Sequence, residues 1–385
     1  MSIRVRRSKV PKLNGDGEYN VRYLILEDNE PMFEVNRYLD RVSSNSYLTG
    51  KQYSFVLATY LKFLKHVGIH YKNVTNSTVI DHYIKTLLGY SGEAAVINIK
   101  SDRSRDTILF HLSVIKNFYV FLEDERSVQI NPLTSGVKTQ KRNNTRMRNK
   151  FLYGQVWDFQ AEKSIYASAI YTKESRDYVK WYSQNQIQQF IKQLPTLRDV
   201  AVFWISVATG MRIGEILGLR LEHVDRFVNE LQVRKRNNTE NDARAKTTER
   251  EIPVPEEVIA IIEDYLRSER EEADIYYSDY LFINLFGKHK GRAYKPYQFL
   301  RVLKRTAGRM GMDSSKIRTH SGRSTRTQQL LNDAKEGLIT EQAILDVMGW
   351  SSSASLTPYR DKSNSKELIR TADKLREKGP TEWQK

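Results

Sequence analysis

The sequence contains no cysteine and no long apolar segment. The absence of cysteine excludes disulfide scaffolds, thiol catalysis, iron–sulfur clusters and every zinc site built on cysteine, and it fits a reducing compartment. The longest nearly uniform apolar run, Val200 to Ala208, is far shorter than the roughly 20 residues of a membrane-spanning helix. The basic first residues are not followed by an apolar stretch of signal-peptide length. We therefore expect a cytoplasmic protein without a transmembrane helix.

Positive charge, in contrast, is abundant. The 385 residues include 62 Lys and Arg against 46 Asp and Glu, which gives a formal net charge of +16. With 39% hydrophobic and 11% aromatic residues, the chain has enough apolar material for two or three folded domains and is not a disordered chain. A surface of this charge attracts polyanions, because phosphates that it neutralises release their condensed counterions. Nucleic acid is the expected partner, and a generally basic enzyme is the alternative.

Two blocks of basic residues contain no acidic residue. The first consists of Arg4, Arg6, Arg7, Lys9 and Lys12, and the second consists of Lys138, Lys141, Arg142, Arg146, Arg148 and Lys150. Blocks of this kind are typical of arms and linkers that contact a nucleic-acid backbone. From the first block we predict DNA contacts by Arg4, Arg6 and Arg7, and from the second by all six residues.

Helical periodicity dominates the first third of the chain. Apolar residues recur at spacings of three and four from Tyr53 to Leu64 and again from Ile108 to Leu122, which predicts two amphipathic helices. A short strand-like segment, Val21–Leu26, precedes them. We expect a basic N-terminal arm over 1–30 and a small helical domain over 31–135.

The rest of the chain indicates a linker and a second domain. Residues 136–180 lack a clean period and are predicted to form a basic linker. Beyond them, helical segments alternate with two strand-like segments, Leu231–Val233 and Glu251–Val254, which predict a small antiparallel sheet. We expect the second domain over 181–364 and a tail helix over 365–385. The expected fold class is mainly α with a small antiparallel β-sheet.

The second domain carries residues suited to phosphodiester chemistry. Cleavage of a phosphodiester without metal or water needs a nucleophile, fixed cations at the phosphate oxygens and a proton donor for the departing oxygen. Arg212 lies at the predicted start of a helix, and Arg323 follows His320 by three residues, so that both would share one helix face. Arginine suits this task because its planar fork binds two phosphate oxygens at once.

These residues belong to a series of motifs that resembles a known family. The motifs are, in chain order, Thr209-Gly-x-Arg212-x-x-Glu215, Lys246-Thr247, His320-x-x-Arg323, Gly349-Trp350 and Tyr359. Their order and spacing are similar to the boxes of the tyrosine recombinases, the phage integrase family. The resemblance covers Ser183 to Tyr359, and more loosely Ser46 to Pro132. It implies a helical core-binding domain followed by an α+β catalytic domain.

The resemblance also implies a mechanism. The implied catalytic set is Arg212, Lys246, His320, Arg323, Trp350 and Tyr359. Tyr359 would attack the scissile phosphate to form a 3′-phosphotyrosyl link, while the two arginines hold the phosphate and His320 assists as a hydrogen-bond donor or proton acceptor. Lys246 would protonate the leaving 5′-oxygen, and the Trp350 indole N–H would donate to a phosphate oxygen. Glu215 is expected to be a structural ion-pair partner. Neither ATP, a metal nor another cofactor is expected.

The implied activity is site-specific DNA recombination that integrates, excises or transposes a mobile element. The implied partners are double-stranded DNA, three further copies of the chain in a homo-tetramer on paired sites, and accessory recombination proteins. A type IB topoisomerase would use the same tyrosine chemistry to relax supercoils, and a catalytically silent DNA-binding protein could retain the fold. Covalent capture of DNA separates the silent protein from the two enzymes.

Three details of the motifs lead to separate expectations. Lys235 also lies near the predicted hairpin and is the alternative to Lys246 as proton donor. Gly322 stands where the family usually has Leu, which predicts looser packing under the active-site helix. Pro358 directly precedes Tyr359 and is expected to bias Thr357 toward an extended conformation.

Overall fold

The computed structural model describes residues 2–11, 19–44, 46–89, 103–133, 178–236, 238–245 and 248–359. The chain divides into two compact units, Met1–Ser175 and Arg176–Lys385, and each unit has a hydrophobic core of its own. Helices dominate both units, which confirms the predicted fold class, and each unit also contains a three-stranded antiparallel sheet. Among the described residues, no helix combines the length and the apolar character needed to cross a membrane.

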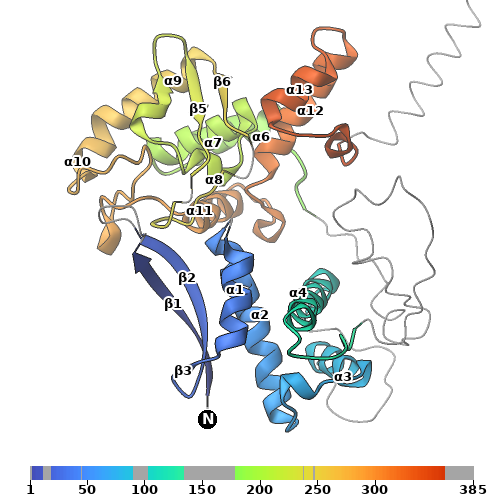
Figure 1. Cartoon of the computed structure of the whole chain (residues 1–385). Helices are drawn as coiled ribbons and strands as arrows, with labels where there is room; N and C mark the ends of the chain where they lie inside the picture. The colour runs from blue at the N-terminus through green and yellow to red at the C-terminus, as the bar shows by residue number, and fades with distance from the viewer. Residues whose placement is uncertain are drawn as a thin grey trace, which may run out of the picture. The chain divides into compact units, whose positions relative to one another are not determined.

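The first unit combines a small sheet with helices (Figure 1). Its elements are β1 (Ile3–Pro11), β2 (Tyr19–Glu27), β3 (Glu30–Pro31), α1 (Phe33–Ser43), α2 (Tyr47–His66), a 3-10 helix (Tyr71–Asn73), α3 (Ser77–Leu87) and α4 (Arg105–Asp124). The sheet order is β1-β2-β3, and both pairings are antiparallel. The two predicted helical stripes lie in α2 and α4, and the strand-like segment lies in β2, so these predictions are confirmed.

The β1–β2 hairpin has one face in the core and one face outside it. Ile3 and Ile25 are buried among residues of α1, α2 and α4, whereas Arg4 and Arg6 on β1 are exposed. Successive side chains of a strand point to opposite faces, so the alternation of Ile, Arg and Val at the start of the chain places the arginines together. The segment that we expected to be an arm therefore begins as an ordered strand that displays its charge on one face.

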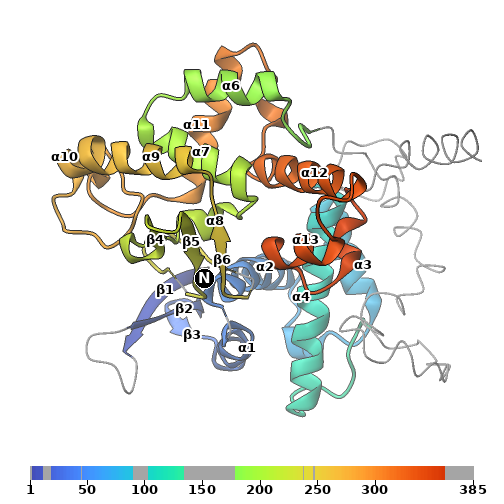
Figure 2. The ribbon, with the colours of Figure 1, turned by 90° about the horizontal axis from the view of Figure 1, so that it is seen from above.

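The second unit is organised around α7. Its elements are α6 (Gln184–Gln193), α7 (Leu197–Thr209), α8 (Ile213–Ile216), a 3-10 helix (Leu221–His223), β4 (Val224–Asp225), β5 (Glu230–Val233), β6 (Arg250–Pro253), α9 (Glu256–Tyr265), a π-helix (Leu266–Arg270), α10 (Glu271–Ala273), a 3-10 helix (Gly287–His289), α11 (Pro296–Arg309), a 3-10 helix (Ser314–Lys316), α12 (Ser321–Lys335), α13 (Glu341–Met348) and a 3-10 helix (Ser353–Leu356). In Figure 2, α7 lies between α9 and α12, and it packs on both. The apolar run Val200–Ala208 is this central helix, which explains why it is hydrophobic on nearly all sides.

The predicted sheet of the second unit is confirmed and has the order β4-β5-β6. Leu231 pairs with Ile252 and both are buried against the core. A separate small core joins α12, α13 and the 3-10 helix that follows them, and it contains Met348, Leu356 and Tyr359. This arrangement brings the last described residue of the chain next to the start of α12.

Candidate active site

Arg323 lies buried between the ends of two helices. Its side chain donates from Nη1 to the carbonyl oxygen of Gly210 at 2.7 Å and from Nη2 to that of Met348 at 2.8 Å. Gly210 ends α7 and Gly349 ends α13, both in the left-handed conformation that glycine adopts at helix ends. Helix C-termini carry unpaired carbonyls and partial negative charge, so they hold a cation well.

Burial is the main cause that lowers the pKa of Arg323 to about 10, and the nearby Arg212 lowers it further, while Glu215 acts in the opposite direction. The guanidinium therefore stays charged at neutral pH. Its buried Nε–H has no hydrogen-bond partner among the residues that the structure describes. A cation fixed in this way is suited to binding an anionic oxygen.

Arg212 lies at the N-terminus of α8 and is tied to a buried carboxylate. The backbone N–H of Arg212 donates to Oε2 of Glu215 at 3.0 Å, and its Nη1 donates to Oε1 at 3.2 Å. Arg250 from β6 donates its Nη2 to the same carboxylate at 3.0 Å and its Nε to the carbonyl oxygen of Val347 at 2.8 Å. Glu215 is fully buried, so this network confirms the interpretation of Glu215 as a structural partner. The motifs gave no indication that Arg250 would share this carboxylate.

His320 and Tyr359 come together at the start of α12. His320 Nε2 lies 3.1 Å from the Tyr359 hydroxyl, although 39 residues separate them in the chain. Burial, followed by the positive charges of Arg323 and Arg212, lowers the pKa of His320 below its ordinary value. The imidazole is therefore neutral at neutral pH, and a neutral ring protonated on Nδ1 can accept the phenolic proton on Nε2.

Trp350 completes the cluster. Its ring centroid lies 5.7 Å from that of Tyr359, and the guanidinium carbon of Arg323 lies 4.9 Å from the Trp350 ring. Aromatic rings attract cations to their faces, so Trp350 supports both the cation and the phenol. The structure thus brings five of the six predicted catalytic residues into one unit: Arg212, His320, Arg323, Trp350 and Tyr359. Lys246, the sixth, lies outside the described residues.

The segment that carries Tyr359 is a helical turn. Thr357 has φ −51° and ψ −41°, so the expectation that Pro358 makes it extended is wrong. The Thr357 N–H donates to Ala354 at 3.3 Å and the Tyr359 N–H donates to Leu356 at 2.9 Å, and these bonds outweigh the local preference of a residue before proline. Lys180, which belongs to none of the motifs, donates to the Pro358 carbonyl at 2.6 Å and fixes the turn from outside.

Gly322 allows α12 and α7 to approach closely. A Cβ atom at Gly322 would lie 3.1 Å from Cβ of Ser206 and 3.3 Å from its carbonyl carbon, and it would collide with the Ser206 hydroxyl. The expectation of looser packing at this position is therefore wrong, because the glycine allows tighter contact between the helices. His320 and Arg323 flank Gly322 at the start of α12, so they lie next to this contact with α7.

Of the two candidate lysines, the structure describes only Lys235. Lys235 is exposed at the end of β5, and its backbone N–H donates to Oε1 of Glu249 at 2.9 Å. The preference for Lys246 over Lys235 as the proton donor therefore rests on the sequence motif.

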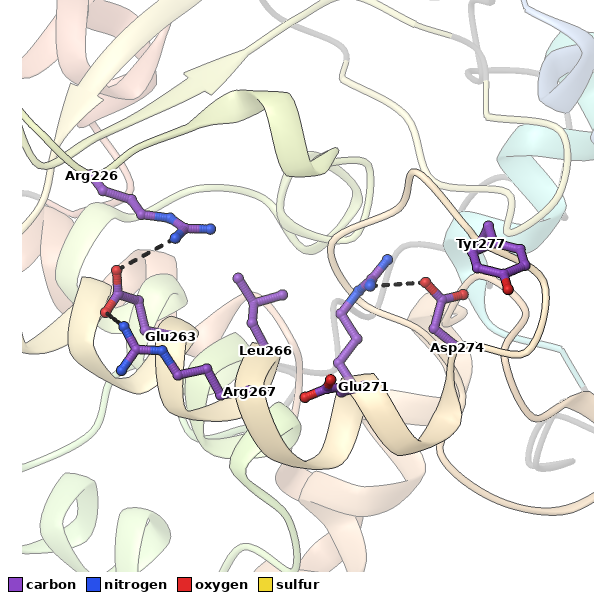
Figure 3. Close-up of a pocket in the computed structure, with 8 residues that line it drawn as sticks. Arg226, Glu263, Leu266, Arg267, Glu271, Asp274 and Tyr277 are labelled. Carbon is purple, nitrogen blue, oxygen red and sulfur yellow. Dashed lines mark hydrogen bonds and ion pairs between the residues drawn. The ribbon is translucent and has the colours of Figure 1, made fainter.

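One pocket of the second unit lies away from this cluster. It measures about 370 Å³ and is lined by residues of α9, the π-helix and α10, together with Arg226 and Tyr277. Figure 3 shows Glu263 between Arg226 and Arg267. The ion pairs measure 3.7 Å to Arg226 and 2.9 Å to Arg267. None of the predicted catalytic residues lines it, so the chemistry is assigned to the cluster around Arg323.

The second unit matches a known protein family. Residues 180–366 match the model of the phage integrase family. The matched segment is therefore a phage integrase domain, as found in tyrosine recombinases. The family resemblance inferred from the motifs is thereby confirmed.

Relatives of the chain include a transposase and tyrosine recombinases. The chain is 25% identical over 336 residues to transposase A from transposon Tn554 of Staphylococcus aureus. This alignment covers 84% of the chain and 87% of the transposase. The chain is 22% identical over 289 residues to a XerC-like tyrosine recombinase of Caldanaerobacter subterraneus subsp. tengcongensis, which covers 70% of this chain and 66% of the relative. The crystal structure of the XerH site-specific recombinase in a post-cleavage complex shares the fold, with a TM-score of 0.54, 13% identity and coverage of 87% of this chain and 83% of XerH.

Proposed function

We propose that this chain is a site-specific DNA recombinase that moves a mobile element by cleaving and rejoining DNA through a tyrosine. The observation that carries the proposal is the 3.1 Å contact between the Tyr359 hydroxyl and the neutral His320, next to the buried Arg323. A nucleophile, its proton acceptor and a fixed cation lie together, as phosphoryl transfer requires. The likeness to a transposase over 84% of the chain favours transposition as the biological outcome.

In the proposed reaction, the Tyr359 oxygen attacks phosphorus and passes its proton to His320 Nε2. The bond between the tyrosine oxygen and phosphorus forms, and the bond between phosphorus and the 5′-oxygen breaks. Lys246 gives a proton to that oxygen, which leaves a 5′-hydroxyl and a 3′-phosphotyrosyl link. Arg212 and Arg323 neutralise the charge that develops on the non-bridging oxygens. A 5′-hydroxyl from another strand reverses these steps, so neither ATP nor a metal is needed.

The proposed contacts with the DNA backbone come from the two basic blocks, both of which fall within Met1–Ser175. In the first unit, Arg4 and Arg6 lie on the outer face of β1, opposite Leu26 and Leu24 of β2, and this face is proposed to contact the DNA backbone. Arg7 is exposed on the same strand and belongs to the proposed contacts. The second basic block, Lys138 to Lys150, lies outside the described residues and remains a prediction.

The proposed assembly is a homo-tetramer on paired sites, in which the tail helix 365–385 of one protomer binds its neighbour. That segment also lies outside the described residues. Such a head-to-tail contact closes only when all members of a ring are present. Accessory recombination proteins are proposed as further partners. Because the matched relatives are a transposase and recombinases, we do not retain the topoisomerase alternative.

A plasmid recombination assay tests the proposed function. A supercoiled plasmid carrying two copies of the junction between an element and its flanking DNA is incubated with the protein, and a plasmid without the junctions is the control. We expect deletion or inversion between the junctions, and no such product from Tyr359→Phe. Relaxation of both plasmids without exchange would instead establish a topoisomerase.

A further inference from the structure

Two buried asparagines anchor the polar stretch that joins β5 to β6. Asn241 is completely buried and Asn238 is 4% exposed. A buried amide is costly unless its donors and acceptor find partners, so these positions are stabilised by specific hydrogen bonds. The stretch is therefore more than a solvent-exposed hairpin loop.

Asn241 makes three hydrogen bonds to the backbone. Its Nδ2 donates to the carbonyl oxygen of Leu217 at 2.8 Å and to that of Tyr294 at 3.1 Å. Its Oδ1 accepts the N–H of Ala243 at 3.0 Å, which forms a turn, and Asp242 within this turn has φ +59°. One side chain thus reverses the loop and ties it to two segments far away in sequence.

After this turn the loop returns along α8. A Cβ atom on Gly214 would lie 2.7 Å from the carbonyl oxygen of Arg244 and 3.0 Å from its nitrogen, and one on Gly218 would lie 2.8 Å from Nδ2 of Asn238. Gly214 and Gly218 are four residues apart, so they lie on the same side of the helical segment that starts with α8. Since α8 starts directly after Arg212, the loop lies against the helix that presents a proposed phosphate-binding arginine.

The anchored loop leads directly to the proposed acid. Ala243 and Ala245 are buried, and Ala245 immediately precedes Lys246 in the sequence. We propose that Asn241 is a positioning residue for Lys246: its hydrogen bonds fix the loop as far as Ala245, the residue that precedes the lysine in the sequence. This inference rests on the proposed function, in which Lys246 donates the proton.

Leaving-group rescue tests this role in the full-length protein. Wild type and Asn241→Ala are compared on a nicked DNA that traps the covalent intermediate, with either an ordinary scissile phosphate or one whose 5′-bridging oxygen is sulfur. A thiolate leaves without a proton, so a defect in proton donation disappears on the sulfur substrate. General acids contribute about 10²–10⁴-fold, and we expect Asn241→Ala to lose on the order of 10-fold or more on ordinary DNA and to recover on sulfur DNA.

Asn284→Ala is the matched control. Asn284 is 6% exposed and donates to the carbonyls of Arg292 at 2.8 Å and Ala293 at 3.1 Å, but it lies on another segment of the same unit. Its replacement should affect both substrates equally. Asn241→Ser keeps an acceptor for the turn and provides a second variant if Asn241→Ala folds poorly.

A double-mutant cycle with Lys246→Ala gives an independent criterion. If Asn241 acts through Lys246, adding Asn241→Ala to Lys246→Ala should slow cleavage little further. The inference would be overturned if the two substitutions lowered the cleavage rate independently, so that their effects multiplied. It would also be overturned if Asn241→Ala lowered the rate equally on both substrates. Either result would leave the proposed function intact. If Lys246→Ala itself fails to recover on sulfur DNA, the assignment of the acid is wrong and the inference fails with it.

Discussion

Gly322 lies where α12 crosses α7, and a single methyl group at this position should impair cleavage before it impairs DNA binding. In Gly322→Ala the new Cβ would lie 3.1 Å from Cβ of Ser206 and would collide with its hydroxyl. The two helices must therefore separate, or α12 must shift along α7. Either movement displaces His320 and Arg323, which lie on both sides of the substitution.

The expected cost follows from this close packing. Overpacking a buried site costs about 1–3 kcal/mol. For a unit of this size each kcal/mol lowers Tm by about 2–4 °C, so we expect a decrease of about 2–12 °C. Arg323 donates to two carbonyl oxygens at 2.7 and 2.8 Å, so its position tolerates little movement. A displacement of about 1 Å in an active site can reduce the reaction rate about 100-fold.

Melting temperature, DNA affinity and covalent-adduct formation are measured together. Gly308→Ala is the control, because Gly308 lies in α11 and a methyl group there would have nothing within 4 Å, so alanine should stabilise the helix by about 0.5–1 kcal/mol. Combining Gly322→Ala with Ser206→Gly should restore cleavage, although glycine within α7 costs about 1 kcal/mol of stability. An unchanged melting temperature and cleavage rate in Gly322→Ala, or no recovery in the double variant, would show that this helix crossing does not control the site.

Three further predictions concern charge. Glu215→Gln removes the carboxylate that holds Arg250, and it should lower the free energy of unfolding by about 3–5 kcal/mol in a denaturant titration; a decrease below about 1 kcal/mol would contradict a buried network. Because the pKa of His320 is lowered, the cleavage rate should stay constant as the pH falls to about 6.5 and decrease only at lower pH. The stability that the neutral ring contributes to the folded state should be lost over that same acidic range. A cleavage rate that rises on acidification would contradict the role of His320 as a proton acceptor. Replacing Arg4 and Arg6 by alanine should weaken binding to all DNA sequences and reduce the log–log salt slope by about 0.9 for each phosphate that is no longer neutralised, whereas an unchanged slope would mean that the hairpin does not touch the backbone.

Features encoded by local periodicity could be predicted from the sequence. The stripes from Tyr53 to Leu64 and from Ile108 to Leu122 lie in α2 and α4, because an amphipathic helix has to bury its apolar side. The residues that gather around Arg323 could be predicted because the motifs have a fixed order and spacing. The density of positive charge at the start of the chain led to the expectation of an arm, whereas Ile3–Pro11 form the strand β1.

Features that depend on distant contacts could not be predicted. Asn241 lies in a polar stretch typical of a loop, and only the carbonyls of Leu217 and Tyr294 make it part of the core. The turn that contains Thr357 is held by Lys180, which donates to the Pro358 carbonyl from a distant part of the chain, and the tight packing at Gly322 depends on the helix opposite. In each case a tertiary contact overrides the local preference.

The chemical identity of the link between protein and DNA tests the proposed tyrosine nucleophile most directly. The protein is incubated with nicked DNA that carries the junction of an element, digested with protease, and the DNA-linked peptide is sequenced by mass spectrometry. We predict a peptide linked through Tyr359 to a 3′-phosphate, together with a free 5′-hydroxyl, and no adduct from Tyr359→Phe despite nearly unchanged DNA binding. An adduct at another residue, a 5′-phosphate link, or a normal yield from Tyr359→Phe would contradict the proposed mechanism.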